Sequence, residues 1–228
     1  MSIHEECGVF GIYNPAGDCA RTTYYGLYAL QHRGQEACGI ATMNGLELSY
    51  HKDLGLVGDV FDDKTLDDLN GTIAVGHVRY STTGGGRREN AQPLTLKYVK
   101  GTLAVAHNGN LVNAGELREE LENEGAIFST GNDTEIFMHL LVRALRRHNL
   151  PEAIREACSR VRGAYCLLIL AGSTLVAVRD PFGFHPLALG RLDGKPVFAS
   201  ETCAFDLLEA EYERSVEPGE MIIVDASG

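Results

Sequence analysis

The chain has 228 residues, of which 44% are hydrophobic, enough for a substantial core in one large domain or two small ones. Its 20 basic and 31 acidic residues give a net charge of −11, which argues against a nucleic-acid-binding protein because that function needs a basic face. No apolar run approaches the roughly 20 residues of a membrane-spanning helix, and residues 1–6 hold two glutamates and no apolar stretch. We therefore expect a cytoplasmic protein with no secretory signal and no membrane partner.

In the first half of the chain, short runs rich in β-branched and aromatic residues predict strands at 8–13, 38–43, 47–51, 72–80 and 102–107. Apolar residues at helical spacing predict a helix at 23–32. The long loop 81–93 contains three consecutive glycines, at positions 84–86. Such a loop can hinge closed over a ligand, although a mobile surface loop is the simpler interpretation.

In the second half, a charged helix is predicted at 115–123 and a strongly amphipathic one at 134–147, with N-cap candidates at Asn132 and Asp133. Pro151 opens a helix at 152–161. There follow strands at 164–170, 174–179, 187–191, 196–200 and 221–225, and a short helix at 202–208. Strands and helices come in blocks, which favours an α+β fold over a doubly wound parallel sheet.

Cys7 is a candidate nucleophile, although a lone cysteine before a strand is usually a packing residue. If residues 1–6 were removed, its thiol and a free α-amino group would lie on one residue. The pKa of an α-amine is about 7.7–8 and that of a thiol about 8.5, so the amine could act as the general base, directly or through one water.

No Cys-x-x-Cys pair occurs in the sequence. We therefore predict no metal site, and expect the other five cysteines to be small buried hydrophobic residues.

Three further segments each have a simple and a functional interpretation. Arg79, at a strand end, is either a surface ion-pair partner or a bidentate clamp for a carboxylate. Asn108-Gly109 is either a hairpin turn or an oxyanion hole made from a side-chain amide and a backbone N–H. Asp133 is either a helix cap or the partner of a substrate ammonium. Together with Cys7, the functional set suits attack on the side-chain amide of a free amino acid.

These residues lie in motifs that resemble the glutaminase domain of the amidophosphoribosyltransferases, a class II glutamine amidotransferase domain of the N-terminal-nucleophile hydrolase superfamily. The motifs cover almost the whole chain: residues 7–12 (CGVFGI), 30–36 (LQHRGQE), 76–82 (GHVRYST), 107–110 (HNGN), 133–135 (DTE), 179–181 (RDP) and 218–220 (PGE). The resemblance implies a four-layer αββα sandwich of two antiparallel sheets. It also implies hydrolysis of glutamine through a γ-glutamyl thioester on Cys7.

The resemblance further implies a role for each candidate residue. Arg79 would bind the glutamine carboxylate and Asp133 its ammonium, while Asn108 and Gly109 would form the oxyanion hole. In the same family, the loop that closes over glutamine contains Thr82. Arg33 lies near the site in this family and is linked to signalling between domains.

The resemblance also implies a division of the chain into a propeptide, residues 1–6, and a glutamine amidotransferase domain, residues 7–228. The phosphoribosyltransferase domain, fused or separate, would be a partner absent from this chain. In the parent enzymes, ammonia converts phosphoribosyl pyrophosphate to phosphoribosylamine in purine biosynthesis. No cofactor is expected in this chain; Mg²⁺ and a 4Fe–4S cluster would belong to the full-length enzyme, which we expect to be a homo-oligomer. One departure is His185, where the family usually has Arg; we favour a harmless surface replacement.

Three alternatives stay open. The chain could be the glutaminase domain of another class II amidotransferase, such as glucosamine-6-phosphate synthase or glutamate synthase, although the segments 31–35 and 78–82 favour the purine enzyme. It could be a catalytically silent regulatory module of the same fold, against which the retained candidate residues argue. A papain-like cysteine protease has no support, because no cysteine lies in the sequence context typical of that family.

Overall fold

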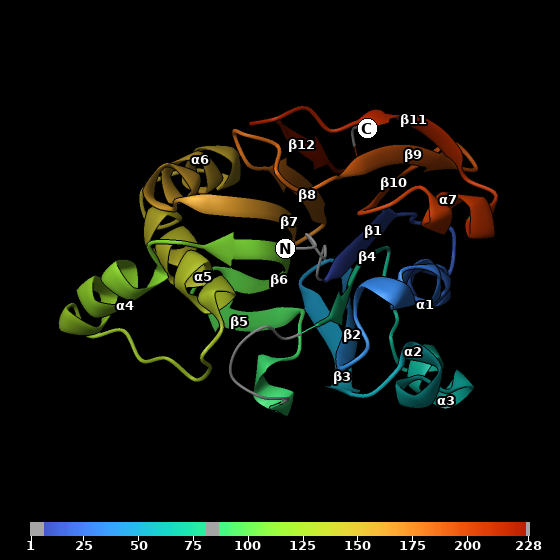
Figure 1. Ribbon diagram of the computed structural model, residues 1–228, viewed down its shortest axis with the longest axis horizontal. Helices are drawn as coiled ribbons and strands as arrows, with labels where there is room; N and C mark the ends of the chain where they lie inside the picture. Colours follow the sequence, from blue (N-terminus) through green and yellow to red (C-terminus); the bar gives the residue numbers. More distant parts are fainter. Residues whose placement is uncertain (1–6, 81–86, 227–228) are drawn as a thin grey trace, which may run out of the picture.

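Two antiparallel sheets packed face to face organise the computed structural model, which describes residues 7–80 and 87–226. Figure 1 shows helices on the outer face of each sheet, so the layers run helix, sheet, sheet, helix. The predicted α+β sandwich of two antiparallel sheets is confirmed. No helix in these two ranges is long and apolar enough to cross a membrane.

The larger sheet has seven strands. Their order is β11 (Glu211–Ser215), β9 (Ala188–Leu192), β10 (Lys195–Ala199), β1 (Gly8–Tyr13), β4 (Ile73–Arg79), β2 (Ala37–Asn44) and β3 (Glu47–Leu54). The smaller sheet has five, in the order β12 (Met221–Val224), β8 (Thr174–Arg179), β7 (Gly163–Ala171), β6 (Gly101–Leu111) and β5 (Leu94–Tyr98). Strands β1 and β4 therefore lie at the centre of the larger sheet, and β6 and β7 lie inside the smaller one.

Alternate residues along the central strands fill the space between the sheets. This inner cluster includes Val9 of β1, Val75 of β4 and Ala106 of β6, all fully buried. Because side chains alternate between the two faces of a strand, residues two positions further along point into the same space. His77 and Asn108 are those residues, and they are polar where the rest of the layer is apolar; Cys7 directly precedes β1.

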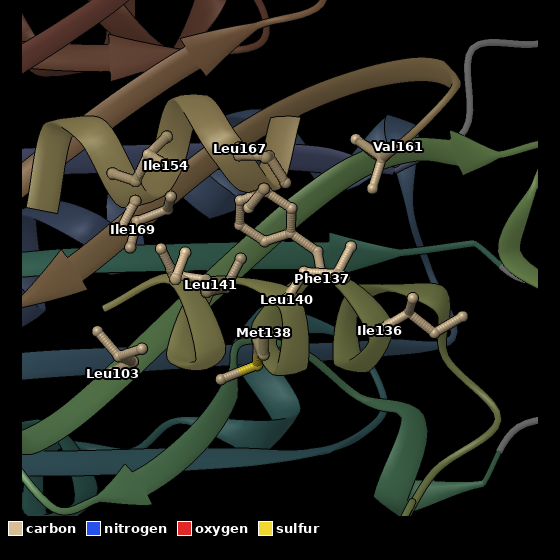
Figure 2. Packing of buried hydrophobic residues seen from close by; sticks show 14 of the residues in the cluster. Leu103, Ile136, Phe137, Met138, Leu140, Leu141, Ile154, Val161, Leu167 and Ile169 are labelled. Carbon is tan, nitrogen blue, oxygen red and sulfur yellow. The ribbon is translucent and has the colours of Figure 1, made fainter. Parts of the chain in front are cut away.

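Two groups of helices cover the outer faces (Figure 1). The smaller sheet is covered by α4 (Ala114–Asn123), α5 (Asp133–Ala144) and α6 (Leu150–Arg160), and the larger sheet by α1 (Cys19–Ala29), α7 (Cys203–Leu208) and the short α2 (Val57–Val60) and α3 (Asp63–Asp67). Figure 2 shows how Phe137 and Leu141 of α5 pack with Ile154 of α6 and with Leu167 and Ile169 of β7. Burial of this stripe holds α5, and with it Asp133, against the sheet.

Most predicted strands and helices are confirmed, and the differences have local causes. Helix α1 begins at Cys19, earlier than predicted, because Asp18 caps it by accepting a hydrogen bond from Arg21 N at 2.9 Å. Strands β5 and β11 were missed, and both are short edge strands. In β11 three of the five residues are charged, which hides any apolar alternation, whereas β5 does alternate apolar and polar residues but is only five residues long. Two short 3₁₀ helices, Gln31–Arg33 and Arg88–Asn90, complete the described elements.

The interpretation of Asn108-Gly109 as a hairpin turn is wrong. Strand β6 continues through both residues to Leu111, and β7 pairs with it along that length, opposite Cys166 and Tyr165. Glycine at 109 is required here for two reasons. Its φ is +147°, and a Cβ would lie 2.0 Å from the carbonyl oxygen of Ala164.

Phe137→Ala should destabilise the fold by about 3–5 kcal/mol, because it removes a fully buried ring between α5, α6 and the smaller sheet. The free energy of unfolding, measured by urea titration, tests this. The matched control is Val99→Ala, in the turn between β5 and β6, where the side chain is 91% exposed and a change within about 0.5 kcal/mol is expected. Equal losses in the two variants would contradict the packing described.

Candidate active site

The pairing of β1 with β4 brings Cys7 beside Arg79. In that antiparallel pair Gly8 lies opposite Val78, so the residue before Gly8 faces the residue after Val78. The odd-numbered residues of β4, from Ile73 to His77, point between the sheets, and Arg79 continues that series. Two residues 72 positions apart in sequence are thus neighbours at one end of the inner layer.

A pocket of about 450 Å³ opens at this end of the sandwich. Four of the predicted site residues line it: Cys7, Arg79, Gly109 and Asp133. They come from the residue before β1, the end of β4, β6 and the first turn of α5. The remaining lining residues are Tyr80, Arg87, Glu89, Asn90, Gln92, His107, Asn110, Ala114, Gly131 and Asn132. The pocket therefore combines a thiol, cationic groups and carboxylates.

Asn108 is buried between the sheets next to this pocket. Neither polar atom of its side-chain amide has a hydrogen-bond partner in the described part of the chain. An unsatisfied buried amide costs about 1–3 kcal/mol, and such groups call for an explanation. The side-chain N–H group of Asn108 can donate to an oxygen atom of a ligand in the pocket, which would explain why the amide is left unsatisfied. The neighbouring Gly109 lines the pocket itself.

Asp133 is a pocket carboxylate and not the helix cap. The cap of α5 is Asn132, whose side chain accepts from Thr134 N at 3.0 Å. Asp133 accepts from Leu111 N at 2.8 Å, and its other oxygen lies 3.4 Å from Nδ1 of His107. Burial opposes its ionisation, but His107 and the backbone N–H groups of Leu111 and Thr134 hold the pKa of Asp133 below its ordinary value. The group is therefore an anion at neutral pH.

Arg33 makes two hydrogen bonds with the backbone of Cys7. Its Nε donates to the Cys7 carbonyl at 2.6 Å, and the Cys7 N–H donates to the Arg33 carbonyl at 3.1 Å. The guanidinium is buried and makes an ion pair with Glu201 at 2.5 Å, a partner that the sequence did not reveal. Arg33 lies outside the pocket lining, so it acts on Cys7 through these contacts.

Cys7 has an unusual backbone conformation. Its φ is +71°, in the left-handed region that non-glycine residues rarely adopt. Such a conformation costs about 1–3 kcal/mol and persists only where surrounding contacts impose it, as the two Arg33 contacts do here. The thiol lies 3.6 Å from the Tyr80 carbonyl oxygen, to which it donates a weak hydrogen bond.

Gln92 is a positioning residue that sequence reasoning missed. Its side-chain amide accepts from His107 N at 2.7 Å and donates to His107 O at 3.2 Å, as a neighbouring strand would. Nε2 of His77 donates to the same carbonyl at 3.0 Å. These bonds fix β6 one residue before Asn108. No local pattern marks Gln92, because its partner lies 15 residues further along the chain.

Thr82, the residue predicted for the closing loop, lies outside the described residues, as do glycines 84–86 and residues 1–6. The flanking residues Tyr80 and Arg87 both line the pocket.

A family model described as "Glutamine amidotransferase domain" matches residues 77–206, more than half of the chain. The chain belongs to this family. The match covers Arg79, Asn108, Gly109 and Asp133 and begins after Cys7.

Individual relatives extend the likeness to nearly the whole chain. The amidophosphoribosyltransferase of Methanocaldococcus jannaschii is 50% identical over 218 residues, covering 95% of this chain and 46% of the relative. That of Bacillus subtilis is 47% identical over 227 residues, covering 99% and 47%. A solved structure of the Bacillus subtilis glutamine phosphoribosylpyrophosphate amidotransferase, complexed with ADP and GMP, superposes with a TM-score of 0.90 at 45% identity, covering 97% of this chain and 48% of that one. This amidotransferase chain thus spans just under half the length of these relatives.

The amidotransferase domain should lose stability in acid partly through His77. Burial lowers the pKa of His77 to about 3, from an ordinary value of 6.5. Between these values the unfolded chain binds a proton that the folded chain does not, so stability falls as pH falls, by up to about 1.4 kcal/mol per pH unit.

His77→Gln keeps a donor for the His107 carbonyl but cannot be protonated, so we expect the free energy of unfolding to depend less steeply on pH between about 6 and 4.5. Urea titrations across that range, compared with the parent chain, measure the difference. Identical slopes for the two proteins would show that His77 does not titrate on unfolding.

Proposed function

We propose that this chain is the ammonia-releasing half of an amidophosphoribosyltransferase, and that it hydrolyses glutamine to glutamate through a thioester on Cys7. One observation carries the proposal: the register of β1 with β4 places Cys7 and Arg79 in one pocket with Gly109 and Asp133. These are a nucleophile, a carboxylate clamp, an oxyanion donor and an ammonium partner. The amidophosphoribosyltransferase relatives, close to 50% identical over almost all of this chain, support the same function.

In the proposed complex, Arg79 binds the α-carboxylate of glutamine and Asp133 binds the α-ammonium. The depressed pKa of Asp133 keeps it ionised at neutral pH, as this pairing needs. The glutamine side chain then extends toward Cys7, with its carbonyl oxygen toward Asn108 and Gly109. Fixing both ends of the backbone orients the amide and removes much of the entropic cost of attack.

The proposed chemistry has two stages. The Cys7 thiolate attacks the amide carbon, and the Asn108 amide and the Gly109 N–H stabilise the negative charge that develops on oxygen. The carbon–nitrogen bond then breaks, the leaving nitrogen takes the proton that came from the thiol, and ammonia departs. Water next attacks the thioester carbon, which releases glutamate and returns a proton to the sulfur.

The proton acceptor for the Cys7 thiol is its own α-amino group, which exists only after residues 1–6 are removed. We propose these residues as a propeptide and residues 7–228 as the domain. The positive φ of Cys7 supports this, because that dihedral angle is defined by the Glu6–Cys7 peptide bond. Hydrolysis of the bond removes the dihedral angle, and with it the strain that the fold imposes.

The acceptor of the ammonia, in this proposal, is phosphoribosyl pyrophosphate, bound by a phosphoribosyltransferase domain that corresponds to the remaining half of the longer relatives. The product would be phosphoribosylamine, made in the cytoplasm for purine biosynthesis. Mg²⁺ and any 4Fe–4S cluster would belong to that other half, and no step described for this chain uses them. Arg33, which holds Cys7, is the proposed element through which the two halves communicate.

Cys7→Ala should abolish ammonia release from glutamine by the processed chain, because the thioester cannot form. Asp133→Asn should keep the thiol but raise KM for glutamine by roughly 10- to 150-fold, the equivalent of about 1.5–3 kcal/mol for a charge-assisted hydrogen bond. A coupled glutamate assay measures both, and Glu122→Gln, on the exposed face of α4, is the matched control for removing a carboxylate. Full activity in Cys7→Ala would overturn the proposal.

Intact-mass spectrometry of the purified chain should show a protein that begins at Cys7. A covalent glutamine analogue should label that residue in processed molecules and leave unprocessed ones unlabelled, because only the former have a free α-amine to accept the thiol proton. Equal labelling of molecules that retain residues 1–6 would contradict the assigned base.

A further inference from the structure

A second group of reactive side chains lies next to Arg33, away from the pocket lining. His32 belongs to the 3₁₀ helix after α1, Cys203 begins α7, and Glu201 precedes it. Each offers one metal-ligand atom, and these three atoms all lie within 4.8 Å of one another. The residues are 169 or more positions apart from His32 in sequence, which is why no metal-binding spacing was visible.

The ring of His32 is oriented as in a metal ligand. Its Nδ1 lies 3.1 Å from the Ala29 carbonyl, which can only accept, so Nδ1 carries a proton. Nε2 then faces the Glu201 carboxylate at 3.0 Å. Nε2 is therefore the ring nitrogen on the side of Glu201, as a histidine ligand of an ion shared with that carboxylate requires.

Glu201 is held as metal-ligating carboxylates usually are. Its Oε1 binds the Arg33 guanidinium at 2.5 Å, which leaves Oε2 for the cluster. Metal ligands typically have such outer partners: a backbone carbonyl on the far nitrogen of a histidine, and a donor on the second oxygen of a carboxylate.

Cys203 supplies the third donor atom. Its Sγ lies 3.7 Å from Oε2 of Glu201, and the residue is only partly buried, unlike the fully buried thiols of Cys38 and Cys166. Ligands held at about 2.0–2.3 Å from one tetrahedral ion lie roughly 3.3–3.8 Å from each other. The cluster contacts of 3.0 and 3.7 Å are close to that spacing.

We propose that His32, Glu201 and Cys203 form a binding site for a single zinc ion, with water as the fourth ligand. A set of imidazole nitrogen, carboxylate oxygen and thiolate sulfur suits Zn²⁺ better than the harder Mg²⁺ or Ca²⁺. Binding exchanges the thiol proton of Cys203 for a sulfur–zinc bond and releases that proton to solvent. Half-exposed ligands and an adjacent guanidinium make this a reversible site and not a structural one.

The site is joined to the nucleophile by two contacts. Glu201 binds Arg33, and Arg33 binds the Cys7 carbonyl at 2.6 Å. A metal ion bound to Glu201 would therefore compete with the Arg33 guanidinium for the negative charge of the Glu201 carboxylate. The zinc site does not depend on the proposed glutaminase activity, and binding alone tests it.

Cobalt(II), a spectroscopic substitute for zinc, is the probe. The protein is the full chain carrying Cys7→Ser, so that the nucleophile cannot itself bind the metal. We expect a thiolate-to-cobalt charge-transfer band at one equivalent, displaced by Zn²⁺. The band should be absent in Cys203→Ser, and His32→Gln should weaken cobalt binding at least about tenfold.

Two matched controls isolate the cluster. Cys158→Ser removes a partly buried thiol elsewhere, and His148→Gln removes a histidine that contacts Glu156 at 2.9 Å with no cysteine in the group. Both should leave the band unchanged. Zinc should also raise the unfolding temperature of the Cys7→Ser chain but not that of the same chain with Cys203→Ser. No band at one equivalent, or a band that survives Cys203→Ser, would overturn the proposal.

Discussion

The antiparallel register between β1 and β4 is the constraint on which the rest of the site depends. It sets Gly8 opposite Val78 and so places Cys7 against Arg79. A slip by one residue would turn every side chain of β1 to the other face and bury the apolar residues Phe10 and Ile12 in the wrong layer. The hydrophobic cores on both sides of the larger sheet therefore enforce the geometry of the pocket.

Polar groups gather at one end of an otherwise apolar inner layer, and most are tied to the backbone of β6. Gln92 and His77 both bind the His107 peptide group, and Asp133 binds Leu111 N from α5. These bonds satisfy buried polar atoms that would otherwise cost free energy. They also hold Asn108, whose side-chain amide has no hydrogen-bond partner among the described residues, in a fixed position. Rigidity of this kind is what stabilisation of a developing charge requires.

Arg33 connects two chemically different regions. On one side it fixes the carbonyl and the strained φ of Cys7, and on the other it neutralises Glu201 beside His32 and Cys203. Because the guanidinium is buried, its charge needs that carboxylate. Glu201 and the backbone of Cys7 are thus linked through one side chain.

The sequence alone determined most of the strands, the amphipathic face of α5 and the residue types of the pocket, because periodicity and motif chemistry are local properties. It misread Asn108-Gly109 as a possible turn, since an Asn-Gly pair favours a hairpin locally and only pairing with β7 extends the strand. It also missed Gln92, Glu201 and the His32 cluster. Their partners are distant in sequence, and only the packing of two sheets and their helices brings them together.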